Sequence, residues 1–193
     1  MGLSRRLFIG ASLSAATASV MAGANVAEAS ATKPQKWDKT VNVVIIGSGG
    51  AGLATAVSAA ENGVKDILVL EKLAFLGGNT AIATGAFNTA DPKQKEQGIE
   101  DSPELHAQQT LKGGDFRANP ELVNELSHNS YDTLTWLESK GVKFQPKILQ
   151  VYGALWPRSH ATAASKGSDY IRVLSEEAKK LGVTIQTQAK VVD

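Results

Sequence analysis

The feature that most constrains the fold of this chain is a glycine-rich turn between an apolar strand and an alanine-rich helix. Residues 41–46 form an apolar, largely β-branched run, which is typical of a buried parallel strand. Residues 53–61 predict a helix that ends at Gly63. Residues 67–70 predict a second buried strand, and Glu71 follows it directly. A strand, a helix and a strand in this order predict an α/β, Rossmann-like fold with a parallel sheet and flanking helices.

The turn has the glycine spacing of a dinucleotide-binding loop. Gly47 permits the tight turn, Gly49 lets the backbone approach a pyrophosphate, and Gly52 lets the helix lie close to the strand. The N-terminus of the helix that follows the turn offers N–H groups and a partial positive charge to the pyrophosphate. Because strand, helix and strand surround the glycines, we interpret the turn as a dinucleotide site rather than a flexible loop.

Glu71 stands where a carboxylate that binds ribose hydroxyls is expected. It follows Gly52 by 19 residues, close to the roughly 20 that this fold requires. An acid at this place favours an unphosphorylated ribose, as in FAD or NAD, over NADP. Residues 72–90 are rich in small and polar residues, which let a backbone press against an extended ligand but also occur in surface turns. An NAD enzyme would continue here with further β–α units, so the segment favours FAD.

Several short segments together form a wider pattern. They are Gly47–Gly52, Glu71-Lys72, Gly77–Thr80 with Gly85 and Asn88, Lys112–Asp115, Asn119–Val123, Trp136–Val142 and Trp156–His160. The pattern resembles the FAD-binding domain of the fumarate reductase/succinate dehydrogenase flavoproteins, in particular their exported, flavocytochrome-c-type members. The resemblance runs from about Val41 to the last residue.

The resemblance implies a set of FAD-binding residues. The backbone near Ala51 would hold the pyrophosphate, Glu71 the adenosine ribose, and the backbone of Val191 the adenine. The full set is Gly47, Gly49, Gly50, Ala51, Gly52, Glu71, Lys72, Gly77, Gly78, Asn79, Thr80, Gly85, Ala86 and Val191. Of these, Asn79, Thr80, Gly85 and Ala86 would approach the ribityl and isoalloxazine part. The chain departs from the family at Ala86, where members often carry glycine, and at residues 161–164, which replace a Pro-Thr-Gly-Gly-like stretch.

The resemblance also implies an activity. In the complete enzyme, a hydride would pass from the flavin to the C=C bond of an unsaturated carboxylic acid, with an arginine supplying the proton. Family members are far longer, so we expect residues 41–193 to be the N-terminal part of the domain, incomplete at the C-terminus, without the cap domain or any catalytic residue. A dehydrogenase acting on a ketosteroid or another unsaturated acid, and a noncatalytic FAD-binding fragment, remain alternatives.

The first 29 residues predict an export signal. Arg5 and Arg6 precede an apolar stretch that ends with Ala27 and Ala29, as in a twin-arginine signal. Such a signal moves folded, cofactor-loaded proteins, so we expect a periplasmic product after a linker over residues 30–40. A membrane-spanning helix is the rival interpretation, but the many serine, threonine and glycine residues disfavour it, and we expect no membrane span after signal removal.

Composition excludes several classes of protein. The 193 residues carry 20 Lys and Arg against 19 Asp and Glu, so bulk attraction to nucleic acid is not expected. The absence of cysteine excludes disulfides, thiolate metal sites and covalent haem attachment. Electrons must then come from another protein, such as a cytochrome. No His, Asp and Glu have metal-site spacing, so no metal is expected.

The rest of the chain predicts three helices and a strand. The helices begin at Ser102, Asn119 and Ser168, where capping residues or proline precede apolar periodicity, and the strand covers residues 183–188. The middle helix has an apolar stripe that begins with Leu122, Val123 and Leu126 and continues through Ser130, Leu134 and Leu137.

Three histidines invite a functional interpretation. Arg158 and His160 are predicted in a loop, where they either stabilise a reduced flavin or simply bind carbonyls and make a loop hydrogen bond; the second interpretation is favoured. His106 and His128 lie on predicted helices, far in sequence from the motifs, and are expected at the surface.

Overall fold

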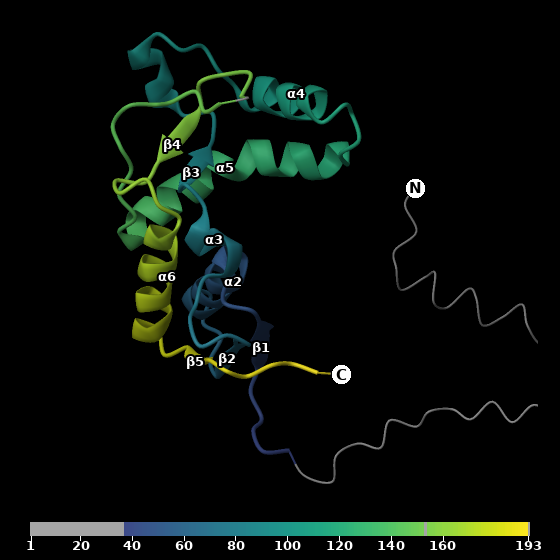
Figure 1. Cartoon of the computed structure of the whole chain (residues 1–193), viewed down its shortest axis with the longest axis vertical. Coiled ribbons are helices and arrows are strands. Elements are labelled where there is room, and N and C mark those ends of the chain that lie inside the picture. The colour runs from purple at the N-terminus through teal and green to yellow at the C-terminus, as the bar shows by residue number, and fades with distance from the viewer. Residues whose placement is uncertain (1–36, 153, 193) are drawn as a thin grey trace, which may run out of the picture. The chain divides into compact units, whose positions relative to one another are not determined.

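A computed structural model describes residues 37–152 and 154–192. The predicted signal over residues 1–29, and most of the linker, lie outside the described residues. The chain from Lys39 onward forms one compact unit (Figure 1). Within the described residues, no helix combines the length and the apolar character needed to cross a membrane.

A parallel sheet carries the glycine-rich turn, as the sequence predicts. Its strands are β1 (Val43–Ile46), β2 (Ile67–Leu70) and β5 (Thr184–Gln186), in the order β1-β2-β5. Helix α2 (Gly50–Glu61) connects β1 to β2, which pair in parallel. The predicted α/β fold is therefore confirmed. The helix begins at Gly50 rather than Leu53 because the glycines themselves form its first turn, which an alanine-based pattern cannot reveal.

Strand β1 lies at one edge of this sheet. Its neighbour within the described residues is β2 alone. Two of its apolar side chains are turned to solvent, with Val44 52% and Ile46 69% exposed. The opposite face of the strand contributes Ile45 to the core. Parallel sheets normally bury both faces, so one face of β1 is unusually open.

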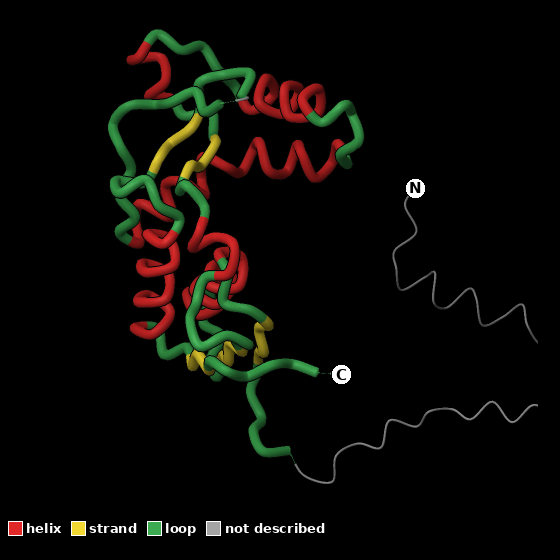
Figure 2. Tube along the Cα trace, in the orientation of Figure 1, coloured by secondary structure: helices red, strands yellow, loops and turns green. Residues whose placement is uncertain are grey.

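Two helices cover the buried face of the sheet. Helix α2 buries Leu53, Ala56, Val57 and Ala60, and α6 (Ser168–Lys180) packs against it (Figure 2). Helix α6 contributes Tyr170, Ile171, Val173, Leu174 and Ala178 to the same core. Helix α6 has a pronounced apolar face, and the sequence therefore predicts the residue at which the helix ends to within one position.

The remaining elements form a second layer around a small antiparallel sheet. They are α3 (Gly78–Ile82), β3 (Ala86–Asn88), η1 (Pro92–Gln97), α4 (Pro103–Gly113), α5 (Pro120–Lys140) and β4 (Ser159–Ala161). Strands β3 and β4 pair antiparallel. The predicted starts of α4 and α5 are confirmed, since Ser102 Oγ accepts from Leu105 N and Asn119 Oδ1 accepts from Glu121 N.

The predicted apolar stripe of α5 is partly wrong. Leu122 is 69% and Leu126 56% exposed. The buried residues are instead Val123, Ser127, Ser130, Leu134 and Leu137. These residues recur every three or four positions and define one helical face, from which Leu122 and Leu126 each lie one residue away. Ser127 was missed because a polar residue on the buried face conceals this periodicity from an analysis based on hydrophobicity.

Candidate functional site

The glycine-rich turn brings the start of α2 against the end of β1. Gly47 has a φ of +94°, and its N–H donates to Leu70 O at 2.8 Å. A Cβ atom added to Gly52 would lie 2.0 Å from Gly47 O. No side chain fits at position 52 without moving the turn. The backbone conformation at Gly47 and the close approach at Gly52 together fix the position of the helix N-terminus.

The N-terminus of α2 suits a negatively charged ligand. Its cap residue, Gly49, makes no side-chain cap hydrogen bond, and its first turn contains no acidic residue. The partial positive charge of the helix is therefore not neutralised by a carboxylate of the same turn. Thr80 Oγ1 accepts from Gly50 N at 3.1 Å and fixes this end of the helix to α3. The residues present fit a diphosphate at this position.

A buried hydrogen-bond cluster holds the turn to the end of β2. Glu71 Oε2 accepts from Ser48 N at 3.0 Å and from Ser48 Oγ at 2.7 Å, while Oε1 accepts from Leu73 N at 2.9 Å. The Leu73 N–H and then the Ser48 hydroxyl and N–H lower the pKa of Glu71. The carboxylate is therefore ionised. With roughly four acceptor positions on a carboxylate and three of them used, one remains for a donor group of a ligand.

The Gly77–Thr80 segment joins the same cluster. Gly77 N donates to Ser48 Oγ at 3.3 Å, and Gly77 pairs with Gly49 as an isolated bridge. Gly77 has a φ of +116° and Gly78 a φ of +48°, both in the left-handed region that favours glycine. Three segments that the sequence singled out, around residues 47–52, 71–72 and 77–80, are thus brought together by Ser48. Sequence reasoning missed Ser48; a hydroxyl inside the turn, opposite the acid after β2, is the signal that could have found it.

The chain after β5 completes a groove. Ala189 N donates to Glu71 O at 2.9 Å and Gln188 N donates to Leu73 O at 3.0 Å. These bonds lay the last described residues along the glycine turn. A groove of about 490 Å³ results. The predicted FAD-binding residues that line it are Gly47, Gly49, Glu71, Lys72, Gly78 and Val191.

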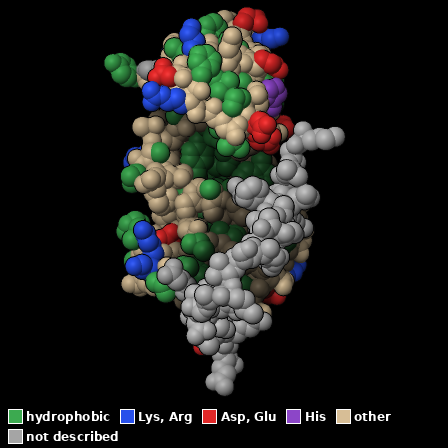
Figure 3. Space-filling model, turned by 90° about the vertical axis from the view of Figure 1, so that its right-hand side faces the viewer, with side chains coloured by type: hydrophobic (Ala, Val, Ile, Leu, Met, Phe, Trp, Pro, Cys, Tyr) green, Lys and Arg blue, Asp and Glu red, His purple; other side chains and the backbone are tan. Residues whose placement is uncertain are grey.

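A second, apolar cavity of about 310 Å³ lies beyond the start of α2. Gly50, Ala51 and Thr80 line it among the predicted residues, with Phe87 and Trp136 among the others. Figure 3 shows a hollow with hydrophobic side chains on this face of the molecule. Gly50 and Ala51 follow directly after Gly49 of the groove, so the lining of the cavity continues from that of the groove. An extended ligand with a polar and an apolar part is therefore a suitable occupant.

Five predicted residues line neither the groove nor the apolar cavity. They are Gly52, Gly77, Asn79, Gly85 and Ala86. Gly85 has a φ of +78°, its carbonyl accepts from Tyr170 Oη at 2.9 Å, and an added Cβ would lie 2.7 Å from the Lys166 carbonyl carbon. Gly52, Gly77 and Gly85 thus have structural reasons to be glycine. Asn79 and Ala86 are exposed.

The predicted environment of Arg158 and His160 is wrong. His160 lies in β4 rather than a loop, with Nε2 3.2 Å from Asp91 Oδ2 and Nδ1 3.1 Å from Arg158 O. Arg158 binds a carboxylate instead of carbonyls: its Nε and Nη2 donate to Asp101 at 3.0 and 2.8 Å. Both pairs are almost fully buried and join β4 to the segment around η1. The partners are distant in sequence, which is why local patterns did not reveal them.

His106 is buried, in contrast to the predicted surface position, whereas His128 is exposed as predicted. His106 is 5% exposed and lies on the face of α4 that packs inward. His128 Nε2 lies 3.3 Å from Glu104 Oε1. Among the described residues, no group of three or more His, Asp or Glu is arranged to hold a metal ion.

Comparison with known proteins agrees with this geometry. The sequence family described as "FAD binding domain" matches residues 42–193. The acrylate reductase flavoprotein subunit of Shewanella woodyi is 35% identical over 189 residues, which cover 97% of this chain and 37% of that protein. The chain thus spans little more than a third of this relative.

Solved structures give the same result. A flavocytochrome c3 fumarate reductase in its open conformation matches with a TM-score of 0.75 and 30% identity, over 81% of this chain and 28% of that chain. A 3-ketosteroid-Δ4-(5α)-dehydrogenase from Rhodococcus jostii RHA1 matches with a TM-score of 0.73 and 29% identity, over 82% of this chain and 40% of that chain. The chain therefore belongs to the family of FAD-binding domains found in fumarate reductase flavoproteins, and its cofactor is FAD.

Proposed function

We propose that this chain is the FAD-binding part of an exported flavoprotein reductase that reduces the C=C bond of a small unsaturated carboxylic acid. The observation that carries the proposal is the groove in which the start of α2 and the Ser48–Glu71 cluster meet. Acrylate and fumarate reductases among the similar proteins support the substrate class.

The chain's own residues have defined roles in this proposal. The backbone of Gly47–Ala51 and the N-terminus of α2 would hold the diphosphate. The remaining acceptor position of Glu71 would accept from a ribose hydroxyl, and the backbone near Val191 would lie against the adenine. Bound FAD supplies the hydride-transfer chemistry. The apolar cavity beside Thr80 and Phe87 would exclude water from the flavin side.

Substrate binding and proton donation require residues that we do not assign within this chain. We propose that they belong to a segment outside residues 1–193, in the same polypeptide or a separate one, corresponding to the part of the relatives that the chain does not match. A cytochrome-like electron donor, in a separate protein or in that segment, would supply the electrons, since residues 1–193 contain no cysteine to attach haem covalently. Residues 1–29 would direct export of the folded protein to the periplasm.

A second candidate is a dehydrogenase of a ketosteroid-type substrate, which the similarity to a ketosteroid dehydrogenase favours. The two candidates share the FAD site and differ in the substrate. A noncatalytic FAD-binding fragment is the third outcome, and it requires the same groove.

The test is a titration of the purified full chain with FAD, followed by flavin fluorescence and visible absorbance. We expect saturable binding that raises the melting temperature, since a ligand that binds only the folded state stabilises it. Absence of binding, with the chain folded, would contradict the proposal. Reoxidation of photoreduced, bound FAD is then compared with fumarate, acrylate and 4-androstene-3,17-dione. Acid-dependent reoxidation supports the reductase and steroid-dependent chemistry supports the dehydrogenase. Absence of both is the expected result for a noncatalytic fragment and also for an enzyme tested without the segment that carries its catalytic residues.

Export is tested separately. Residues 1–40 are fused to a reporter that is active only when exported in the folded state, with Arg5 and Arg6 both changed to Lys as the matched control. We expect export of the fusion and its loss in the double variant. Equal export of both would contradict the twin-arginine assignment.

A further inference from the structure

One short segment forms a rim of the apolar cavity of about 310 Å³ that lies beyond the start of α2. Thr80 and Phe87 both line this cavity, and residues 81–86, which we call the rim segment, connect them. Thr80 is held at the start of α2 by the hydrogen bond that its Oγ1 accepts from Gly50 N. The position of the rim segment therefore decides the shape of the cavity between Thr80 and Phe87.

The rim segment is fixed by the chain that leads into α6. Gly167 N donates to Ala83 O at 2.8 Å, and Thr162 N donates to Gly85 O at 3.1 Å. A Cβ atom added to Gly167 would lie 1.9 Å from Thr80 O, so no side chain fits there without moving the backbone. The two stretches of backbone are thus in direct contact, and the rim segment takes its position from the start of α6.

Tyr170, in the first turn of α6, adds a side-chain contact to the rim segment. Its hydroxyl donates to Gly85 O at 2.9 Å, the same carbonyl that accepts from Thr162 N. Its ring lines the apolar cavity, and the residue is 8% exposed. Burial, and then the negative charge of Asp169, raise the pKa of Tyr170, so the hydroxyl keeps its hydrogen near pH 7. One side chain therefore forms a wall of the cavity and fixes its rim.

The ring of Tyr170 is held independently of its hydroxyl. Phe144 packs against it, with the ring centroids 6.1 Å apart and the planes inclined by 51°. Tyr170 also belongs to the main hydrophobic core, as do Val173 and Leu174 of the same helix. Phenylalanine at position 170 would keep these apolar contacts and lose the hydrogen bond to Gly85. The role of the hydroxyl can therefore be tested separately from that of the ring.

We propose that Tyr170 is a positioning residue of the FAD site, whose hydroxyl holds the rim segment in the conformation that receives the isoalloxazine ring. This inference rests on the proposed function. The groove at the start of α2 suits the adenosine and the diphosphate, and the lining of the apolar cavity continues from it. The flavin half of FAD is therefore expected in the cavity, of which the Tyr170 ring is one wall. The hydroxyl acts on the carbonyl of Gly85 and not on the ligand, so the role is positioning and not catalysis.

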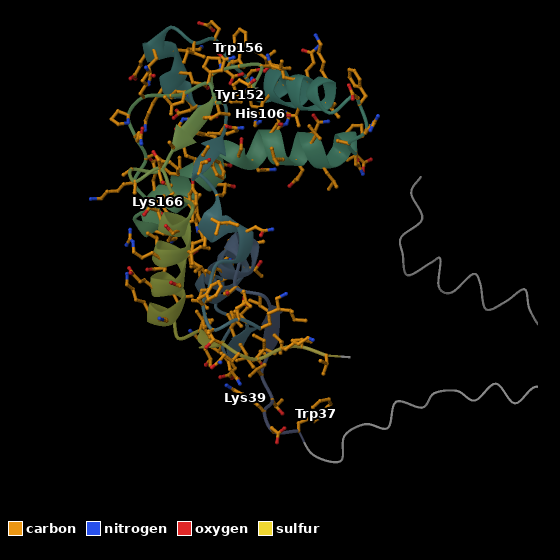
Figure 4. The ribbon with its side chains drawn as sticks, in the orientation of Figure 1. Trp37, Lys39, His106, Tyr152, Trp156 and Lys166 are labelled. Atoms are coloured by element: carbon orange, nitrogen blue, oxygen red, sulfur yellow. The ribbon has the colours of Figure 1, made fainter. Side chains whose placement is uncertain are left out.

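The first test needs no FAD. Tyr170→Phe and Tyr152→Phe are compared in the full chain by amide hydrogen exchange; Tyr152 is fully exposed and lies away from α6 (Figure 4). The N–H groups of Thr162 and Gly167 bond to the rim segment, so we expect both to exchange about threefold to tenfold faster in Tyr170→Phe, the effect of one lost neutral hydrogen bond. Equal exchange in the two variants would overturn the proposal.

The second test uses bound FAD and separates positioning from a merely structural role. The visible absorption bands of FAD depend on the surroundings of the isoalloxazine ring, whereas a general loss of stability leaves the bands of bound FAD where they are. We expect shifted bands for FAD bound to Tyr170→Phe, with an affinity about threefold to tenfold weaker. FAD bound to Tyr152→Phe should match FAD bound to the unmodified chain. An unchanged spectrum of FAD bound to folded Tyr170→Phe would overturn the proposal.

If Tyr170→Phe does not fold, the unmodified chain decides by NMR. FAD should shift the signals of the Tyr170 ring in a saturable way, and ADP, which carries no isoalloxazine ring, should not. No shift with FAD bound, or an equal shift with ADP, would overturn the proposal. Failure of the proposed function is recognised differently, since the unmodified chain would then bind no FAD, whereas failure of this inference leaves that binding intact.

Discussion

The hydroxyl of Ser48 lies 2.7 Å from Oε2 of Glu71 and connects the two ends of the βαβ unit. Ser48 follows β1, Glu71 follows β2, and the same hydroxyl accepts from Gly77 N. One side chain thus fixes the relative positions of the turn, the acid and the start of α3. The shape of the groove therefore depends on this side chain as well as on the glycines of the turn.

Replacement of Ser48 should therefore destabilise the protein. Ser48→Ala removes a buried hydrogen bond to an ionised carboxylate and leaves Gly77 N without its acceptor, so we expect a loss of about 1.5–3 kcal/mol in the free energy of unfolding. Urea denaturation measures it. Ser139→Ala is the matched control, because Ser139 is exposed on α5 and bonds only to a carbonyl of its own helix. Equal stability of the two variants would contradict the role of Ser48.

The charge of Glu71 should make stability depend on pH in the acidic range. Hydrogen bonds from Leu73 and Ser48 lower the pKa of Glu71 in the folded state. Its stabilisation is thus fully present above the ordinary glutamate pKa of about 4.3 and is lost as the pH falls through the lower, folded-state pKa. Glu71→Gln should flatten this part of the pH profile and weaken FAD binding about tenfold or more.

Glu125→Gln on the exposed face of α5 is the control for that series. Unfolding is followed by circular dichroism between about pH 2 and 7, a range that contains the glutamate titration. We expect the control to keep both the acid dependence and the FAD affinity. A Glu71→Gln profile parallel to that of the unmodified chain would show that Glu71 is not the group responsible.

Gly52→Ala should damage the turn. The added Cβ would lie 2.0 Å from Gly47 O, so the backbone must move, and we expect a loss of about 2–3 kcal/mol together with loss of FAD binding. Gly113→Ala provides the comparison, since a Cβ there meets no atom within 4 Å and the residue is helical. That substitution should be neutral or slightly stabilising. FAD binding retained by a stable Gly52→Ala protein would contradict the proposed position of the diphosphate.

His106 should also make the free energy of unfolding depend on pH, because burial disfavours its charged form. Its pKa is lowered in the folded state by burial and by Arg158, so between that pKa and the unfolded value of about 6.5 the unfolded chain binds more protons. The free energy of unfolding should thus rise with pH through this window and level off above it. His106→Leu should remove the rise and His128→Leu should keep it, with urea denaturation measured at a series of pH values. A rise that persists in His106→Leu would assign the effect to another group.

Local signals in the sequence were sufficient for the elements that position the site. Each of these elements is determined by residues within one or two turns. They are the β-branched strand before Gly47, the alanine-rich helix after it, and the starts of α4 and α5, where a capping residue is followed by proline. Such signals do not depend on distant contacts. They predicted the parallel sheet, the glycine turn and the acid after β2, and the comparisons confirmed the FAD-binding family.

The environment of the histidines and of Arg158 could not be predicted in this way. Arg158 and Asp101 are 57 residues apart, and His160 and Asp91 are 69 apart. No short-range pattern encodes which of several charged residues becomes buried with which partner, because the pairing is set by how β4 and η1 pack. The same holds for His106, whose burial follows from the packing of α4 rather than from its neighbours in sequence.

The open edge of β1 has a practical consequence for anyone handling this chain in concentrated solution. Among residues 37–152 and 154–192, no strand pairs with the outer side of β1, so the amide and carbonyl groups beside Val44 and Ile46 form a template on which a strand from a neighbouring molecule can add. Crowded preparations are thus expected to form sheet-to-sheet aggregates first at this strand, and a lysine in place of Val44 is the simplest change that would discourage them.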